Sequence, residues 1–130
     1  MSGATVPESV LPLLTTNMVA VVATVRPDGQ PATATVWVDW DGEQVLFSSR
    51  VGSRKGRNLR GNPYVAIHVV DPGSGSWLQV RGEVTEIRPD ADLAFIDRLS
   101  ERYKGSRYAV RDFEREVFAV APQKVLFSIR

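Results

Sequence analysis

The 130-residue chain contains no cysteine and only one histidine, His68. Without thiols it forms neither disulfides nor cysteine-ligated zinc or iron–sulfur centres, and a single histidine excludes a histidine-rich metal site. We therefore expect no metal site. We interpret His68, in the apolar run "AIHVV", as a structural histidine of a buried strand.

Long hydrophobic runs are also absent. No apolar stretch reaches the roughly 18 residues of a membrane-spanning helix. The first residues, "MSGATVPESVLPLLTTN", have no basic region ahead of their short apolar patch, unlike a secretory signal peptide. We expect a cytoplasmic protein with no membrane association, folded as one domain over residues 1–130.

Acidic residues are missing from one long segment, since no Asp or Glu lies between Glu43 and Asp71. The same segment holds five of the 16 Lys and Arg residues within positions 50–60, although the formal net charge is only +1. Such a local concentration of positive charge indicates a defined anionic ligand rather than general adhesion to polyanions.

Short apolar and alternating runs predict strands. We expect them at residues 18–25, 31–40, 44–49, 64–71 and 77–88, with two more on either side of Pro122. "RPDGQP" predicts a tight turn, and Asp41-Gly42 predicts a hairpin of type I′. Six to seven antiparallel strands with few helices predict a mainly β fold, a small closed or split β-barrel.

Three segments are expected to be helical or partly so. Residues 7–14 form a helix within an N-terminal lid of residues 1–16, and Ser53 caps a short basic helix that ends near Gly61 and Asn62. A further helix begins at Asp90 or Asp92. The segment after it, "YKGSRYAVRDF", is expected to be irregular or weakly helical. Its Tyr103, Arg107 and Tyr108 are expected to pack within the loop, and the lining of a substrate pocket is the alternative.

The basic segment is the strongest functional signal. It joins a strand end, "FSS", to a helix N-terminus, where free N–H groups and the helix dipole favour a phosphate. Ser48, Ser49 and Ser53 add hydroxyl donors. Arg54 and Arg57 share one face of the helix, and Lys55 points about a quarter-turn away. A solvated surface helix is the alternative. Nucleic acid is a second alternative, but the segment has no aromatic residue for base stacking.

Three stretches together resemble a known family: "VATVRPDGQPATATVWVDWDGEQVLFSS", "GSRKGRNLRGNPYVAIHVVDP" and "WLQVRGEVTEI". They are similar to the pyridoxamine 5′-phosphate oxidase-like split β-barrel proteins, which include FMN-binding proteins. The similarity extends over residues 18–130 and is strongest to the branch that uses the deazaflavin coenzyme F420.

The resemblance implies a homodimer with the cofactor in a groove at the dimer interface. It places the main chain of Thr35, Val36 and Trp37 beside the ring system. It places Ser48, Ser49, Arg54, Lys55, Arg57 and Asn58 toward the phosphate or the acidic tail. Trp77 and Gln79 match positions from which the partner subunit completes the pocket.

From the resemblance we expect an F420-dependent oxidoreductase that transfers hydride to a small conjugated, quinone or nitro compound. Five clustered cations suit the phosphodiester and glutamate carboxylates of F420 better than the single phosphate of FMN. The residues form no recognisable acid–base pair, so the catalytic residues stay unassigned. The alternatives are an FMN-dependent oxidoreductase of the same fold, or a non-enzymatic module that binds a flavin, haem or nucleic acid.

Overall fold

The structure is a computed structural model, and it describes residues 4–130. The strands are β1 (Ala20–Val25), β2 (Pro31–Val36), β3 (Val38–Trp40), β4 (Val45–Arg50), β5 (Tyr64–Val70), β6 (Trp77–Pro89) and β7 (Arg115–Ser128). The α-helices are α1 (Pro12–Thr15), α2 (Arg54–Gly61) and α3 (Ala94–Lys104), with 3-10 turns η1 (Glu8–Val10) and η2 (Ala91–Leu93). The mainly β fold of seven antiparallel strands is confirmed.

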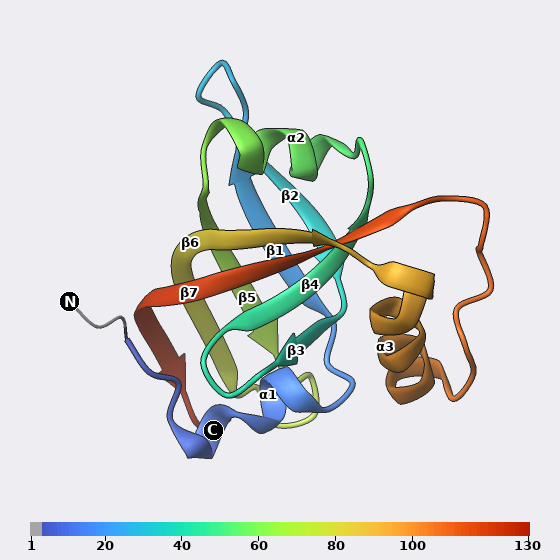
Figure 1. Cartoon of the computed structure of the whole chain (residues 1–130). Helices are drawn as coiled ribbons and strands as arrows, with labels where there is room; N and C mark the ends of the chain where they lie inside the picture. Colours follow the sequence, from blue (N-terminus) through green and yellow to red (C-terminus); the bar gives the residue numbers. More distant parts are fainter. Residues whose placement is uncertain (1–3) are drawn as a thin grey trace.

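All seven strands lie in one sheet, in the order β2-β1-β5-β6-β7-β4-β3. The strands at the two ends of this order, β2 and β3, are separated in the chain only by Trp37. The chain itself therefore joins the two edges of the sheet, and the sheet curls into a barrel (Figure 1). This closure leaves few strand edges open to solvent.

The predicted strand at 31–40 is interrupted in the structure. Before Trp37 the chain pairs with β1, with Val21 opposite Thr35, and after Trp37 it pairs with β4, with Val38 opposite Phe47. The alternating pattern of this stretch is correct on both sides of Trp37. The pattern does not indicate that the chain changes its pairing partner at Trp37, because that change depends on the tertiary arrangement of β1 and β4.

The predicted break at Pro122 is wrong, because β7 runs through it. Pro122 pairs with Gly82, and a register shift between Arg81 and Gly82 lets the ladder absorb one extra residue of β7. A β-bulge of this kind accommodates a proline that lacks an N–H donor. The long strands β6 and β7 therefore form the continuous spine of the barrel.

The barrel interior is a single apolar core. Phe47 of β4 and Phe118 of β7 stack at its centre, with ring centroids 5.0 Å apart, and both are fully buried. Leu13 and Leu14 of α1 join the same core, so the N-terminal segment covers one end of the barrel, at the bottom of Figure 1. Residues 1–3 of the expected lid lie outside the described residues.

Three local predictions need correction. The helix expected at 7–14 is divided into η1 and α1. The hairpin at Asp41-Gly42 forms, but only Gly42 has a positive φ (104°), so the turn is not of type I′. His68 is half-buried on the outer face of β5, because its neighbours Ile67 and Val69 fill the interior side.

The other two helices lie outside the barrel wall. Helix α2 crosses the end opposite α1, and α3 lies beside the barrel (Figure 1). Phe95 and Leu99 of α3 pack on Leu46 and Val117, which point outward from β4 and β7. Strand β4 is consequently buried on both faces, which explains its continuous apolar run.

Candidate functional site

The change of partner at Trp37 opens a gap in the barrel wall. Strand β4 pairs with β3 only from Val45 to Phe47, so Ser48, Ser49 and Arg50 pair with β7 alone. Strand β2 pairs with β1 alone. Within residues 4–130, the facing edges of β2 and β4 therefore have main-chain N–H and C=O groups that are not paired with another strand. These groups are free to form hydrogen bonds with the polar edge of a planar ligand.

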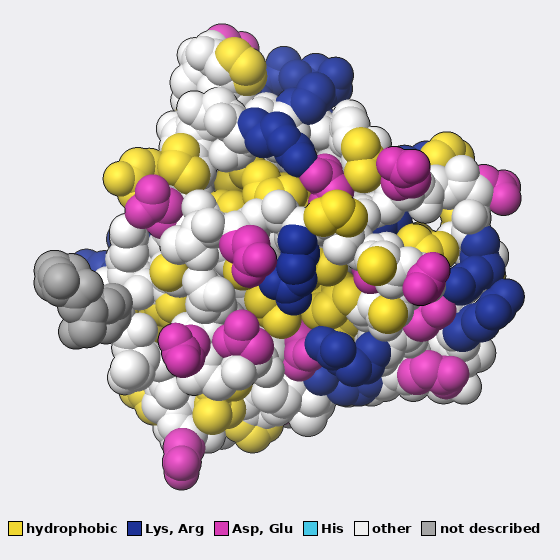
Figure 2. Space-filling view, in the orientation of Figure 1, with side chains coloured by type: hydrophobic (Ala, Val, Ile, Leu, Met, Phe, Trp, Pro, Cys, Tyr) yellow, Lys and Arg dark blue, Asp and Glu magenta, His cyan; other side chains and the backbone are white. Residues whose placement is uncertain are grey.

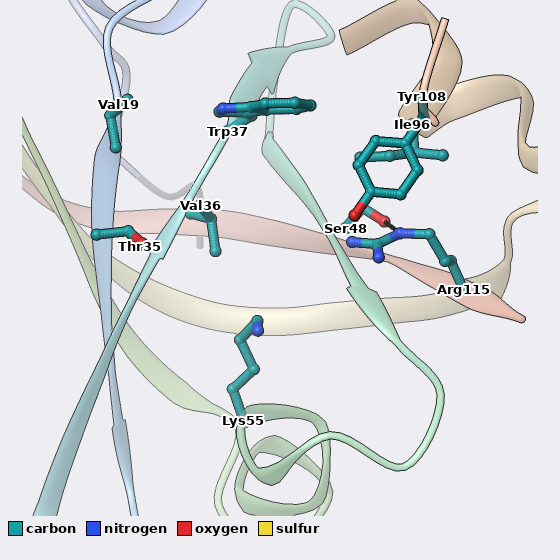
Figure 3. A pocket seen from close by; sticks show the side chains of 9 residues that line it. All are labelled: Val19, Thr35, Val36, Trp37, Ser48, Lys55, Ile96, Tyr108 and Arg115. Carbon is teal, nitrogen blue, oxygen red and sulfur yellow. Dashed lines mark hydrogen bonds between the residues drawn. The ribbon is translucent and has the colours of Figure 1, made fainter. Parts of the chain in front are cut away.

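A cavity of about 200 Å³ occupies this gap (Figure 3). It brings together segments far apart in sequence: the edge of β2, the middle of β4, and residues from α2, α3, the loop after α3 and the start of β7. The lining residues are Val19, Thr35, Val36, Trp37, Ser48, Lys55, Ile96, Tyr108 and Arg115.

Two cations face this cavity. Lys55 extends into it from α2, and Arg115 reaches it from β7, where its Nε donates to Ser48 Oγ at 2.9 Å (Figure 3). Neither side chain forms an ion pair with an acid of residues 4–130. Burial, and then the charge of Arg115, lower the pKa of Lys55; burial likewise lowers that of Arg115. Two partly desolvated cations side by side favour an anionic ligand.

The aromatic rings of Trp37 and Tyr108 also line the cavity. The indole of Trp37 stacks on Tyr103 of α3 at 5.1 Å, and Tyr108 meets it edge-on at 6.1 Å. Tyr103 is held in turn, because its hydroxyl accepts from Val38 N (3.1 Å) and donates to Met18 O (2.7 Å). Trp37 is thus a rigid surface on which a ring system can pack.

Helix α3 is tied to the barrel by a buried carboxylate. Asp39 of β3 accepts from Arg98 at 2.9 Å and from Arg102 at 3.0 Å. Burial alone would raise the pKa of Asp39, but the hydrogen bonds from Arg102, the Trp40 amide and Arg98 outweigh it and lower this pKa. The anchor keeps α3, and with it Tyr103, against Trp37.

The predicted cap of the basic helix is confirmed. Ser53 Oγ accepts from Gly56 N at 3.1 Å and from Ser49 Oγ at 2.6 Å. A Cβ at Gly56 would lie 3.2 Å from Ser53 Oγ, so glycine leaves room for the cap hydroxyl. Ser49 is nearly fully buried, and its hydroxyl donates to the capping residue Ser53. It does not line the cavity.

Arg54 and Arg57 of α2 lie along a path away from the cavity, whereas Arg60 pairs with Glu116 of β7. Lys55 also lines a second, smaller hollow together with Arg54, and Arg57 and Asn58 line a third near the β1–β2 turn. Figure 2 shows Lys and Arg side chains gathered at the end of the molecule where α2 lies. The helix is therefore basic along its length, and only Lys55 enters the main cavity.

Trp77 and Gln79 lie elsewhere, on the outer face of the barrel. Gln79 is opposite His68 and lies within hydrogen-bonding distance of it (3.3 Å), and Trp77 stacks on the His68 ring at 5.4 Å. Neither residue lines a cavity with Trp37 or Lys55 in the same chain. Any contribution to the site would come from a second subunit.

The structure thus brings five of the eleven predicted residues into one cavity: Thr35, Val36, Trp37, Ser48 and Lys55. The binding role of all eleven stays a prediction. Sequence reasoning missed Val19, Ile96 and Arg115, and it assigned Tyr108 to loop packing. Arg115 carried one available signal, since it is the first residue of an apolar strand and has no role in a core.

Among the described residues, no group of three or more His, Cys, Asp or Glu side chains could hold a metal ion. Over the same range, none of the helices has the length and apolar character needed to cross a bilayer.

Comparison with known proteins agrees with this architecture. The sequence pattern of the family described as pyridoxamine 5′-phosphate oxidase matches residues 6–128. A pyridoxine/pyridoxamine 5′-phosphate oxidase of Rhodopseudomonas palustris (strain BisB18) is 30% identical over 121 residues, which are 83% of this chain and 55% of that protein. One from Porphyromonas gingivalis (strain W83) is 30% identical over 89 residues, 67% of this chain and 42% of that protein. The chain spans about half the length of these curated relatives.

Solved structures resemble the chain over nearly its whole length. A structure named F420 reductase is 37% identical, has a TM-score of 0.86, and is matched over 93% of this chain and 98% of its own. General stress protein 26 from Bacillus anthracis, at 18% identity and TM-score 0.72, matches 92% of this chain and 91% of its own and shares the fold. The chain belongs to the pyridoxamine 5′-phosphate oxidase family and has its split-barrel fold, an oxidoreductase fold of the flavin-binding type.

Proposed function

We propose that the protein is an F420-dependent oxidoreductase that binds the deazaflavin in the gap between β2 and β4 and passes hydride to a small conjugated, quinone or nitro compound. The observation that carries the proposal is the cavity lined by Trp37 together with Lys55 and Arg115, two cations that form no ion pair with an acid of residues 4–130. The 37% identity to a structure named F420 reductase supports the same cofactor.

The residues of the cavity fit a molecule with a planar ring and an anionic arm. Trp37 and the edge of β2 suit the ring, and Lys55, Arg115 and Ser48 suit a phosphate. The basic path continues past Lys55 to Arg54 and Arg57. This extension favours the longer polyanionic arm of F420 over FMN.

When bound in reduced form, the deazaflavin supplies the hydride. The protein's own residues would orient the ring, hold the phosphate and exclude water from the reacting face. The geometry offers no side chain with a clear acid–base role, so binding and positioning account for the contribution of the chain.

The proposed enzyme is a homodimer, because the cavity of one chain is small. Its volume of about 200 Å³ falls below the roughly 300–1,000 Å³ of typical cofactor pockets. Thr35 of the cavity begins a row of outward-facing residues that crosses the sheet through Val21, His68 and Gln79. No helix of residues 4–130 covers this face (Figure 1). A second copy on it would complete the cavity and bring its Trp77 and Gln79 to the site.

Titration of the protein with F420 tests the proposal. We expect Lys55→Ala to weaken F420 binding by at least about tenfold, the effect of one lost charge-assisted hydrogen bond. Lys124→Ala is the matched control, because Lys124 is an exposed lysine of β7 outside the cavity. Equal affinities of the wild type and Lys55→Ala would refute the placement of the anionic arm.

A further inference from the structure

The only histidine of the chain belongs to a hydrogen-bonded row on the outer face of the sheet. Arg81 Nε donates to Gln79 Oε1 at 2.9 Å, and Gln79 Nε2 lies 3.3 Å from His68 Nδ1. The residues come from the paired strands β5 and β6, in which His68 is directly opposite Gln79. Each hydrogen bond of the row therefore restricts the direction of the next one.

Arg81 determines which proton His68 carries in this row. A guanidinium donates hydrogen bonds and accepts none, so the Gln79 atom that faces it is the carbonyl oxygen. The other end of the same carboxamide is then the NH₂ group, which only donates. His68 Nδ1 consequently accepts, and the imidazole is neutral with its proton on Nε2.

A protonated His68 does not fit the same row. A proton on Nδ1 would face the NH₂ group of Gln79, donor against donor. Gln79 can accept from that proton only by turning its carboxamide, which sets its NH₂ group against the donor of Arg81. Either arrangement loses one of the two hydrogen bonds, so protonation moves the Gln79 side chain.

The surroundings of His68 offer little to hold a protonated ring in place. The neighbouring strand β1 contributes the uncharged Val21. Asp71 follows β5, but its carboxylate accepts from Gly73 N and Ser74 Oγ. Trp77 stacks on the ring at 5.4 Å, and its π face favours a cation only weakly at an exposed position. The other charged or titratable side chains of this outer face are Tyr64, Arg81, Glu83 and Lys124.

Two of these groups are cations close to the row, and the acid is distant. Arg81 is a member of the row, and Lys124 of β7 is opposite Arg81. Glu83 is opposite Tyr64, four residues along β5 from His68, a separation of roughly 13 Å. The charges of this face therefore do not compensate the hydrogen bond that protonation removes.

The row leads directly to the main cavity. Gln79 is opposite His68, His68 is opposite Val21, and Val21 is opposite Thr35, which lines the cavity. His68 contacts both Gln79 and Trp77. In the proposed homodimer a second copy covers this face, and Trp77 and Gln79 of each subunit approach the cavity of the other. The state of His68 then decides how these two side chains are presented.

We propose that His68 is a positioning residue of the shared site, which rests on the proposed function and its homodimer. In its neutral form it holds Gln79 and Trp77 in the arrangement that completes the cavity of the neighbouring subunit. The neutral form binds the cofactor, so affinity is full above the pH range in which histidine titrates and falls as the pH drops through it.

NMR of the free, untagged protein tests the row without any cofactor. Because His68 is the only histidine, one ¹⁵N spectrum of the imidazole reports its tautomer. At about pH 8 we expect the neutral form with the proton on Nε2. On acidification the side-chain amide signals of Gln79 should shift together with the ring. A proton on Nδ1 at this pH, or Gln79 signals that do not follow the ring, would overturn the proposal.

F420 affinity as a function of pH tests the positioning role. Between about pH 8 and pH 5 the wild type should lose affinity by about tenfold, the effect of one hydrogen bond. His68→Asn keeps an acceptor near the position of Nδ1 but does not titrate. It should bind as the wild type does at pH 8 and keep that affinity at pH 5. The same acid loss in the variant would refute the role of His68.

Arg81→Met separates the row from a general effect of charge. Without the donor of Arg81, Gln79 can turn its carboxamide and accept from protonated His68, so the loss of affinity at acid pH should shrink. Arg88→Met is the matched control, because Arg88 is an arginine of the same strand that pairs with Glu86. An undiminished acid loss in Arg81→Met would overturn the proposal. Failure of F420 to bind at any pH, beside the expected tautomer and the coupled shift of Gln79, would overturn the proposed function instead.

Discussion

At the scale of single residues, Arg115 is the side chain whose role the structure changes most. Its guanidinium is half-buried, donates to Ser48 Oγ at 2.9 Å and lies 5.1 Å from the Tyr108 ring, with no carboxylate partner in residues 4–130. A cation kept at the cost of desolvation indicates a ligand that neutralises it. We therefore propose that Arg115 binds the same anionic group of the ligand as Lys55.

Replacing Arg115 by Gln should weaken F420 binding by about tenfold, because one charge-assisted hydrogen bond is lost. The free energy of unfolding should stay the same or rise slightly, since an unpaired, partly desolvated charge is removed. Calorimetric titration and urea denaturation measure the two effects, with Arg88→Gln as the surface control. Unchanged affinity together with a large loss of stability would make Arg115 a structural residue.

Lys55 predicts a pH dependence of binding. Because burial and Arg115 lower its pKa below the ordinary value of 10.5, Lys55 starts to lose its proton at a lower pH than an exposed lysine does. An anionic ligand binds the protonated form, so affinity should be full below this lowered pKa and should fall as the pH rises through it. Lys55→Met should bind weakly at every pH and lose this alkaline dependence. An identical pH profile in the variant would contradict the assignment.

The residues of the site were predictable to the extent that they are local. The cap at Ser53, the cation at Lys55 and the exposed face of Trp37 follow from spacing within one element. The contribution of Arg115 and Ile96 depends on β7 and α3 meeting β2 and β4, which are far apart in the sequence. No local sequence pattern predicts those long-range contacts.

At the scale of elements, the bulge between β6 and β7 sets the course of the barrel spine. A Cβ built at Gly82 would lie 2.1 Å from the carbonyl oxygen of Ala121, a distance that no relaxation of a flexible side chain relieves. Glycine is therefore required where β6 passes the Pro122 bulge.

Gly82→Ala should lower the free energy of unfolding by about 2 kcal/mol, as overpacking against backbone does. Gly61→Ala is the matched control, because a Cβ there meets nothing within 4 Å and the site is helical. It should be neutral or stabilise the fold by up to about 1 kcal/mol. Urea denaturation of both variants measures these changes in the free energy of unfolding. A Gly82→Ala protein as stable as the wild type would mean that the bulge rearranges freely.

The elements themselves were largely predictable, and their boundaries less so. Apolar and alternating runs identified all of the strand-forming segments. Most of these strands have one face in the core and one outside it, and β4 is buried on both faces. The two errors, at Trp37 and Pro122, occur where a strand changes partner or bulges. At such points the backbone conformation depends on pairing with the neighbouring strand, which the local sequence does not determine.

At the scale of the whole molecule, one face of the barrel exposes apolar side chains in the part of the chain that the structure describes. Val19 and Val21 of the β1 segment are 51% and 39% exposed, and Val70 of β5 is 45% exposed. They lie beside His68, Trp77 and the edge of the main cavity. An apolar face continuous with a ligand site is typical of an interface between subunits.

We predict that the chain sediments at twice its 14.4 kDa mass. Val21→Lys should shift it to the monomer, because the lysine would place a charge in the proposed apolar interface. The same variant should lose F420 affinity although Val21 does not line the cavity. Thr85→Lys, at an exposed position of β6 that does not line the cavity, is the control. A wild-type monomer that binds F420 tightly would rule out the shared site.

The most direct test of the account is a calorimetric titration of the wild-type protein with F420 and, in parallel, with FMN, at low and high salt. The account predicts micromolar or tighter binding of F420, weak binding of FMN, and an F420 affinity that falls as salt screens the contacts of Lys55, Arg54 and Arg57. Tighter binding of FMN, or no binding of either flavin, would contradict it.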